Sequence, residues 1–163
     1  MRLILFYLLL LMAQGFLGVL LAPFAAPDLF LLALVALLWR IQPWNLVLIA
    51  YAAGLFQDIL GHGHLGIHAL GLAGAMMGAI LIRSQFTSSE VLSRVLAVGM
   101  ALLCKWLAIA PLIVWQSGSL ASLKGILSVM PIELVLTFLA SFVIVPWAEA
   151  LLEKTRVFRR ELL

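Results

Sequence analysis

Residues 54–70 concentrate side chains that are able to bind a metal ion or an anion. Asp58 is followed by three histidines, His62, His64 and His68. Imidazole nitrogens and a carboxylate are ligands that zinc and nickel accept. The spacing matches no defined ligand pattern, however. We therefore expect no metal ion and no other cofactor in this chain, and the metal site stays the alternative.

Glycines in the same segment favour a tight turn between two apolar runs. Gly61 and Gly66 allow positive φ and a close approach of the backbone. Asp58 ends the first run and can accept hydrogen bonds from the N–H groups that open the next, where the helix dipole also favours an anion. His68 lies in that first turn. We expect Asp58, Gly61, Gly66 and His68 to fix the turn, or else to contact a partner or ligand.

Lys105 lies in the middle of another apolar run. A charge at this depth of a membrane is costly and is expected to face the interior of the bundle or to be paired. At about 1.5 Å per residue, Lys105 lies roughly 15 Å from the outer end of its run and Glu133 roughly 10 Å, a difference that a lysine can cover. We expect a Lys105–Glu133 ion pair. Asp58 is another possible partner, and a substrate site, a proton site or a contact with another chain is the alternative role for Lys105.

Two further patterns concern packing and the membrane surface. Three small residues, Gly71, Gly74 and Gly78, follow the small-xxx-small spacing of closely packed membrane helices. They predict either packing within the bundle or the docking of a foreign helix. The end of the chain is basic, and we expect it to lie on anionic lipid headgroups, with a cytoplasmic protein as the alternative contact. Its basic residues are Lys154, Arg156, Arg159 and Arg160.

The elements that position these residues follow from composition. Of 163 residues, 66% are hydrophobic and 10% are charged, against about 25% charged in soluble domains. A bilayer is the matching solvent, and helices satisfy their own backbone hydrogen bonds there. We expect an all-α membrane bundle in a single domain, 1–163. Its six transmembrane helices are predicted at about 3–22, 27–42, 44–60, 65–83, 91–115 and 126–152.

The second of these runs is short, and it crosses only with its flanking turn residues or a locally thinner bilayer. Charge favours the crossing. With six spans, the basic residues gather on one side, which the positive-inside rule assigns to the cytoplasm together with both termini. Those residues are Arg2, Arg40, Arg83, Arg94 and the four at the end of the chain, with Lys124 on the other side.

Enzymatic chemistry has little support in the sequence. No serine has the context of a nucleophile elbow, and no phosphate loop or paired carboxylates stand out. The single cysteine, Cys104, excludes an internal disulfide. The basic residues are too few and too dispersed for nucleic acid. A binding or scaffolding role remains.

The layout of six helices in a short chain, together with one motif, resembles the MreD family of rod shape-determining membrane proteins. The motif is Gln57-Asp58, a short glycine turn, then Gly66 and His68-Ala69-Leu70 at the start of the fourth helix. The resemblance implies a non-enzymatic subunit of the bacterial elongation complex in the inner membrane. It implies direct binding to MreC and, through the complex, association with MreB, RodA and a class B penicillin-binding protein.

The family resemblance also implies a fold related to the substrate-binding S-components of energy-coupling factor transporters. We therefore expect an outward-facing hollow between the helices, which the smooth glycine helices and the Asp58 turn present to a segment of MreC. The alternative function is a substrate-binding membrane subunit of a vitamin-type transporter, in which Lys105, Glu133 and Asp58 hold a polar ligand.

Overall fold

The computed structural model describes residues 2–22, 25–60, 65–86, 91–118 and 122–160, with side chains for 8–22, 25–60, 65–86, 92–118, 124–125 and 127–150. The regular structure of these residues is entirely helical. The helices are α1 (Arg2–Leu20), α2 (Leu29–Ala36), α3 (Pro43–Leu60), α4 (Ile67–Gln85), α5 (Val91–Ser117) and α6 (Ser122–Arg160).

Four of the helices are long and apolar enough to cross a membrane. The qualifying stretches are Pro43–Leu60, Ile67–Gln85, Leu92–Ser117 and Leu127–Ala150, and α1 adds a shorter apolar stretch, Leu8–Leu20. The fold class is thus all-α with six helices and four long candidate spans. That α1 and α2 also cross the membrane stays a prediction.

Helix α2 is shorter than the sequence predicts. We expected a helix at about 27–42, whereas the α-helix covers Leu29–Ala36. Eight residues rise about 12 Å, well below the roughly 30 Å of a hydrocarbon core. The helix begins after Asp28, which caps it, and its end passes into a turn at residues 37–40. The backbone that continues the run on both sides is therefore not α-helical.

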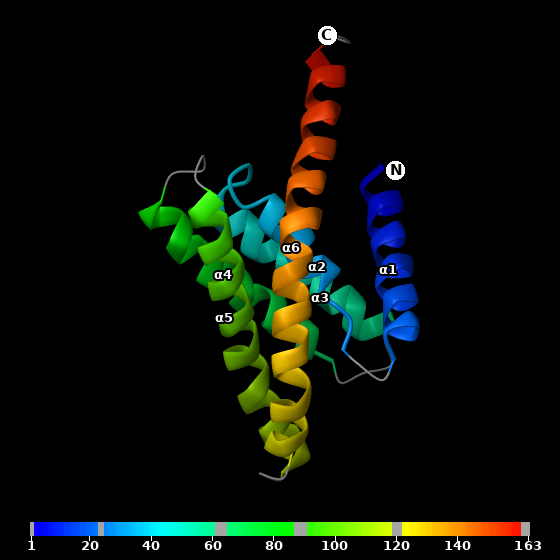
Figure 1. Ribbon diagram of the computed structural model, residues 1–163, viewed down its shortest axis with the longest axis vertical. Helices are drawn as coiled ribbons and strands as arrows, with labels where there is room; N and C mark the ends of the chain where they lie inside the picture. The colour runs from blue at the N-terminus through cyan, green and yellow to red at the C-terminus, as the bar shows by residue number, and fades with distance from the viewer. Residues whose placement is uncertain (1, 23–24, 61–64, 87–90, 119–121, 161–163) are drawn as a thin grey trace.

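Burial explains how such a short helix is held. Seven of its eight residues are buried, and α2 contacts each of the other five helices among the described residues. Leu31, Leu32 and Val35 form the centre of the hydrophobic core with side chains from α3, α4, α5 and α6. Helix α2 is thus enclosed by protein and not by lipid (Figure 1).

Helix α4 packs between α3 and α5, and its three glycines face α5. A Cβ atom at Gly78 would lie 2.6 Å from Cys104 Sγ, and one at Gly74 would lie 2.9 Å from Ala108 Cβ. Gly71 has the same relation to Ile109. In the structure the glycine stripe is covered by α5, and it serves the close packing of these two helices.

Helices α1 and α6 form the less enclosed part of the bundle. Among the described residues α1 packs on α2 alone, and much of its described surface is exposed and apolar. Helix α6 runs from Ser122 to Arg160, so it begins slightly before the predicted start and continues as a helix through the basic end of the chain. Its C-terminal part extends beyond the other helices, and the N-terminus of α1 and the end of α6 point the same way (Figure 1).

Candidate functional site

The start of α2 is a buried polar junction between four helices. Asp28 Oδ1 accepts from the Leu31 N–H at 3.0 Å, as an N-cap does. The Leu29 N–H donates to Gln14 Oε1 of α1 at 2.9 Å. The Asp28 N–H donates to Thr137 Oγ1 of α6 at 3.0 Å. These bonds satisfy backbone donors that would otherwise be orphaned at the start of a buried helix.

Lys105 of α5 joins this junction through an ion pair. Its Nζ lies 2.7 Å from Asp28 Oδ2 and also binds Glu133 Oε1 of α6. The three side chains are largely buried. Glu133 and Thr137 are four residues apart on α6, so both face Asp28 from one side of that helix. The structure therefore brings Lys105 to two carboxylates, one of which the sequence analysis did not assign to it.

Asp58 does not pair with Lys105, because its carboxylate is bound to the start of α4. Oδ2 accepts from the N–H groups of Gly66 at 2.9 Å and Ala69 at 3.2 Å. Oδ1 accepts from the N–H of His68 at 3.0 Å and lies 2.8 Å from its Nδ1. Since a carboxylate only accepts, Nδ1 carries the proton of this bond. Asp58 thus caps a helix whose own N-cap residue, Gly66, has no side chain.

Gly54 lets this cap form. It lies one turn before Asp58, and a Cβ atom there would meet His68 O at 2.4 Å and Ala69 Cα at 2.5 Å. Only hydrogen leaves room for the start of α4 to approach α3 this closely. At the turn itself, Gly66 has a φ of 98°, a backbone conformation that residues other than glycine rarely adopt.

The candidate metal ligands of this turn lie only partly within the described residues. Gly61, His62 and His64 lie outside the described residues. Within the described ranges, no group of three His, Cys, Asp or Glu side chains is placed to hold a metal ion. The absence of a metal ion therefore stays a prediction.

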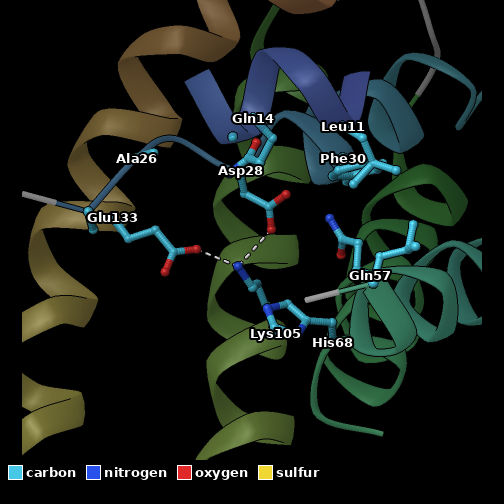
Figure 2. A pocket seen from close by; sticks show the side chains of 12 residues that line it. Leu11, Gln14, Ala26, Asp28, Phe30, Gln57, His68, Lys105 and Glu133 are labelled. Atoms are coloured by element: carbon cyan, nitrogen blue, oxygen red, sulfur yellow. Dashed lines mark hydrogen bonds and ion pairs between the residues drawn. The ribbon is translucent and has the colours of Figure 1, made fainter. Parts of the chain in front are cut away.

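A hollow of about 410 Å³ lies beside the ion pair. Figure 2 shows Lys105 reaching toward Glu133 and Asp28, with Gln57 and His68 on the side of Lys105 that faces away from Glu133. All six helices contribute side chains to the lining. Its polar members are Gln14, Asp28, Gln57, His68, Lys105 and Glu133. A polar hollow inside an apolar bundle is where a membrane protein holds a ligand or a partner group.

Arginines bind the turn that follows α2. Arg83 Nη1 donates to the carbonyls of Leu38 and Ile41, both at 2.6 Å. Arg40 donates to the Glu149 carbonyl at 3.1 Å, and Arg94 forms an ion pair with the Glu149 carboxylate at 3.1 Å. The start of the short helix is thus satisfied by side chains, whereas its last carbonyls accept from backbone N–H groups of the turn.

The basic segment of the C-terminus continues α6. Lys154, Arg156, Arg159 and Arg160 fall within the helix, but their side chains lie outside the described ones. Their contact with lipid or with a protein therefore stays a prediction.

Comparison with protein families decides the identity of the chain. A family model for the rod shape-determining protein MreD matches residues 1–155. The chain belongs to the MreD family. The family is one of non-enzymatic membrane proteins of rod shape determination, and the helices make this MreD-family chain a multi-pass membrane protein. No curated protein and no solved structure gives a significant match, so the relation to S-components stays a prediction.

Sequence reasoning did not assign Asp28, Gln14 or Thr137 to the site of this MreD-family chain. Asp28 carries a usable signal, because it follows Pro27 and directly precedes an apolar run, as N-cap residues do. It is also the first acidic residue of the chain. Gln14 and Thr137 stand in apolar runs without such a signal, and only the fold places them beside Asp28.

Proposed function

We propose that this chain is a membrane scaffold subunit of the elongation complex, binds MreC directly and helps to organise peptidoglycan synthesis. Through that complex it associates with MreB, RodA and a class B penicillin-binding protein. Membership of the MreD family supports the proposal. The observation that carries it is the polar hollow, since every helix contributes side chains to this cavity within the bundle.

The hollow is the contact that we assign to a segment of MreC. The glycine stripe of α4 is occupied by α5, which leaves the hollow as the more suitable surface. Helix α1 supports this choice, because it borders the hollow and packs on α2 alone among the described residues. In this proposal the Asp58 turn shapes one wall, and its His68 side chain lines the hollow that the MreC segment enters.

In the proposed orientation the chain spans the bacterial inner membrane with both termini in the cytoplasm. The arginines that hold the Ile41 end of α2 lie at the cytoplasmic surface in this orientation. The basic residues of α6 lie beyond them, on the anionic headgroups. The described residues 25–42 then cross as a coil, a buried helix and a turn, which is acceptable because protein surrounds them.

Co-purification tests the proposal. The chain and MreC are co-expressed, extracted in a mild detergent and recovered through a tag on the chain. We expect stoichiometric MreC, reduced by Gln57→Trp, which fills the hollow, and unchanged by Gln116→Trp at the exposed end of α5. Failure to recover MreC with a folded chain would reject the scaffold function.

A second candidate function uses the same hollow. Its volume of about 410 Å³ lies within the roughly 300–1,000 Å³ of small-molecule sites, which favours a ligand-binding subunit of a vitamin-type transporter. A gene neighbourhood with an energising ATPase, or a vitamin that raises the melting temperature of the purified chain, would support this function over the scaffold.

A further inference from the structure

Among the described side chains, and with a neutral His68 ring, the formal charges around the hollow do not balance. Two carboxylates, Asp28 and Glu133, surround one ammonium, Lys105, so that the ion pair carries a formal charge of −1. A net charge that is largely buried within a membrane is costly. The hollow beside it is large enough to admit the group that would neutralise it. The missing charge is positive.

The lining offers acceptors for such a group. Among the described side chains, Lys105 is the one partner of the Glu133 carboxylate, which has two oxygens and capacity for further donors. His68 uses Nδ1 for Asp58 and lines the hollow with a half-exposed ring, so its Nε2 is an acceptor in the neutral ring. The side-chain amide oxygen of Gln57 is a third acceptor. An ammonium group has three donors, which matches this set.

The depth of the site indicates what carries the ammonium. Lys105 is twelve residues before the end of α5 at Ser117, which is about 18 Å along the helix. The amine of a phospholipid is held at the headgroup level and would have to descend most of that distance. A lysine on a second membrane helix stands at any depth that its sequence sets, and it requires an anionic partner there.

We propose that the hollow receives a lysine side chain carried by a membrane-spanning helix of the partner, with Glu133, His68 and Gln57 as its acceptors. The proposal rests on the function proposed above, because it specifies how the partner is recognised. The lysine completes a cluster of two carboxylates and two ammonium groups. The partner helix lies along the side of the hollow where α1, within the described part of the chain, packs on α2 alone.

The probe for this proposal is a synthetic polyleucine helix with one central lysine. It is compared with matched helices that carry norleucine or glutamate instead. Each is mixed with the whole chain in vesicles of phosphatidylcholine and phosphatidylglycerol, which contain no amine-bearing headgroup except choline. Association is measured by energy transfer. We expect the lysine helix to bind about tenfold more tightly than either control, since charge-assisted hydrogen bonds are made only with lysine.

Variants of the chain locate the binding. Glu133→Gln should abolish the preference for lysine, and Gln57→Leu should weaken it without touching the ion pair, so that the test survives if Glu133→Gln fails to fold. Gln116→Leu, at an exposed position outside the hollow, should have no effect. Equal association of the three helices would overturn the proposal. Displacement of the lysine helix by added phosphatidylethanolamine would also overturn it, in favour of a lipid amine.

The outcome is separable from that of the MreC experiment. Equal binding of the three helices with intact MreC recovery would reject lysine recognition and leave the scaffold function standing. Selective binding of the lysine helix without MreC recovery would reject MreC as the partner and keep the site.

Discussion

The ion pair of Lys105 is the contact on which the largest effects of single substitutions are expected. Lys105→Met leaves two largely buried carboxylates without their ammonium partner. Breaking a buried ion pair by removing one partner costs about 3–5 kcal/mol, and we expect a loss of folding stability in that range. Thermal unfolding of the purified chain in dodecyl maltoside, followed by circular dichroism, measures it. A melting temperature equal to that of wild type would contradict this role of Lys105.

The two carboxylates should not be equivalent. Asp28 binds Lys105 and also caps α2 through the Leu31 N–H, whereas Glu133 binds Lys105 without capping a helix among the described contacts. We expect Asp28→Ala to be more destabilising than Glu133→Ala by about 1 kcal/mol, the typical value of an N-cap. The same unfolding assay compares the two variants. The reverse order would show that the cap contributes little.

Asp58 gives a third prediction at this scale. Its two oxygens accept three backbone N–H groups and the His68 ring, so Asp58→Ala leaves donors unsatisfied at the start of α4. We expect a loss of about 2–4 kcal/mol, because a cap and charge-assisted hydrogen bonds are lost together. Asn45→Ala, at an exposed position near the start of α3, the helix that carries Asp58, is the control. Equal stability of both variants would refute the capping role.

The sequence predicts the contacts of a residue where its depth in the membrane, or its position at a helix end, limits the possible partners. The depth of Lys105 and Glu133 in their runs is enough to suggest that they meet, and the position of Asp58 before a glycine turn suggests a cap. Asp28 has two roles, and the sequence indicates only the cap. Its pairing with Lys105 depends on where the coil after α1 enters the bundle, which is a property of the tertiary fold.

At the scale of elements, the close approach of α3 and α4 depends on a glycine, Gly54. A Cβ atom at Gly54 would press on the backbone of His68 and Ala69, which cannot rotate away. We expect Gly54→Ala to destabilise the chain by roughly 1–3 kcal/mol, as overpacking does. Gly99→Ala is the matched control, since its Cβ atom meets nothing within 4 Å. Alanine within a helix is favoured over glycine, so this control should be neutral or slightly stabilising.

Unfolding of the two glycine variants in dodecyl maltoside distinguishes the contact from helix propensity. Propensity alone predicts a gain in stability for both alanines. A gain for Gly54→Ala would therefore show that α3 and α4 are not in close contact at this point.

The elements themselves are largely readable from the apolar runs, with α2 as the exception. For α3, α4 and α5, charges and glycines mark the ends, and the structure places the helix ends close to these positions. The run around residue 35 is apolar on all sides, so its pattern does not distinguish a lipid-facing span from a buried core helix. The structure shows the second case, in which side chains satisfy the start of α2 and turn backbone satisfies its end, so that no long helix is needed.

At the scale of the whole molecule, the crossing of the segment around α2 decides the topology. If residues 21–42 cross, Gln42 lies on the same side as both termini, and Gln116 lies on the other side. If they do not cross, Arg40, Arg83, Arg94 and the basic end of α6 still share one side, and Arg2 joins Lys124 on the other. This arrangement fits the positive-inside rule less well than six crossings do. The hydrogen bonds at the start of α2 support the crossing, because they let irregular backbone exist at membrane depth.

Single added cysteines test this topology in intact spheroplasts. We expect Gln116→Cys and Ala22→Cys to react with a membrane-impermeant maleimide and Gln42→Cys to react only after permeabilisation, since all three positions are exposed and the α2 segment separates Ala22 from Gln42. Thr155→Cys near the end of α6 should behave as Gln42→Cys does, and the chain with its native Cys104 alone gives the background. Labelling of Ala22→Cys and Gln42→Cys from the same side would show that the α2 segment does not cross, and the hollow would then need a different route of access for the partner.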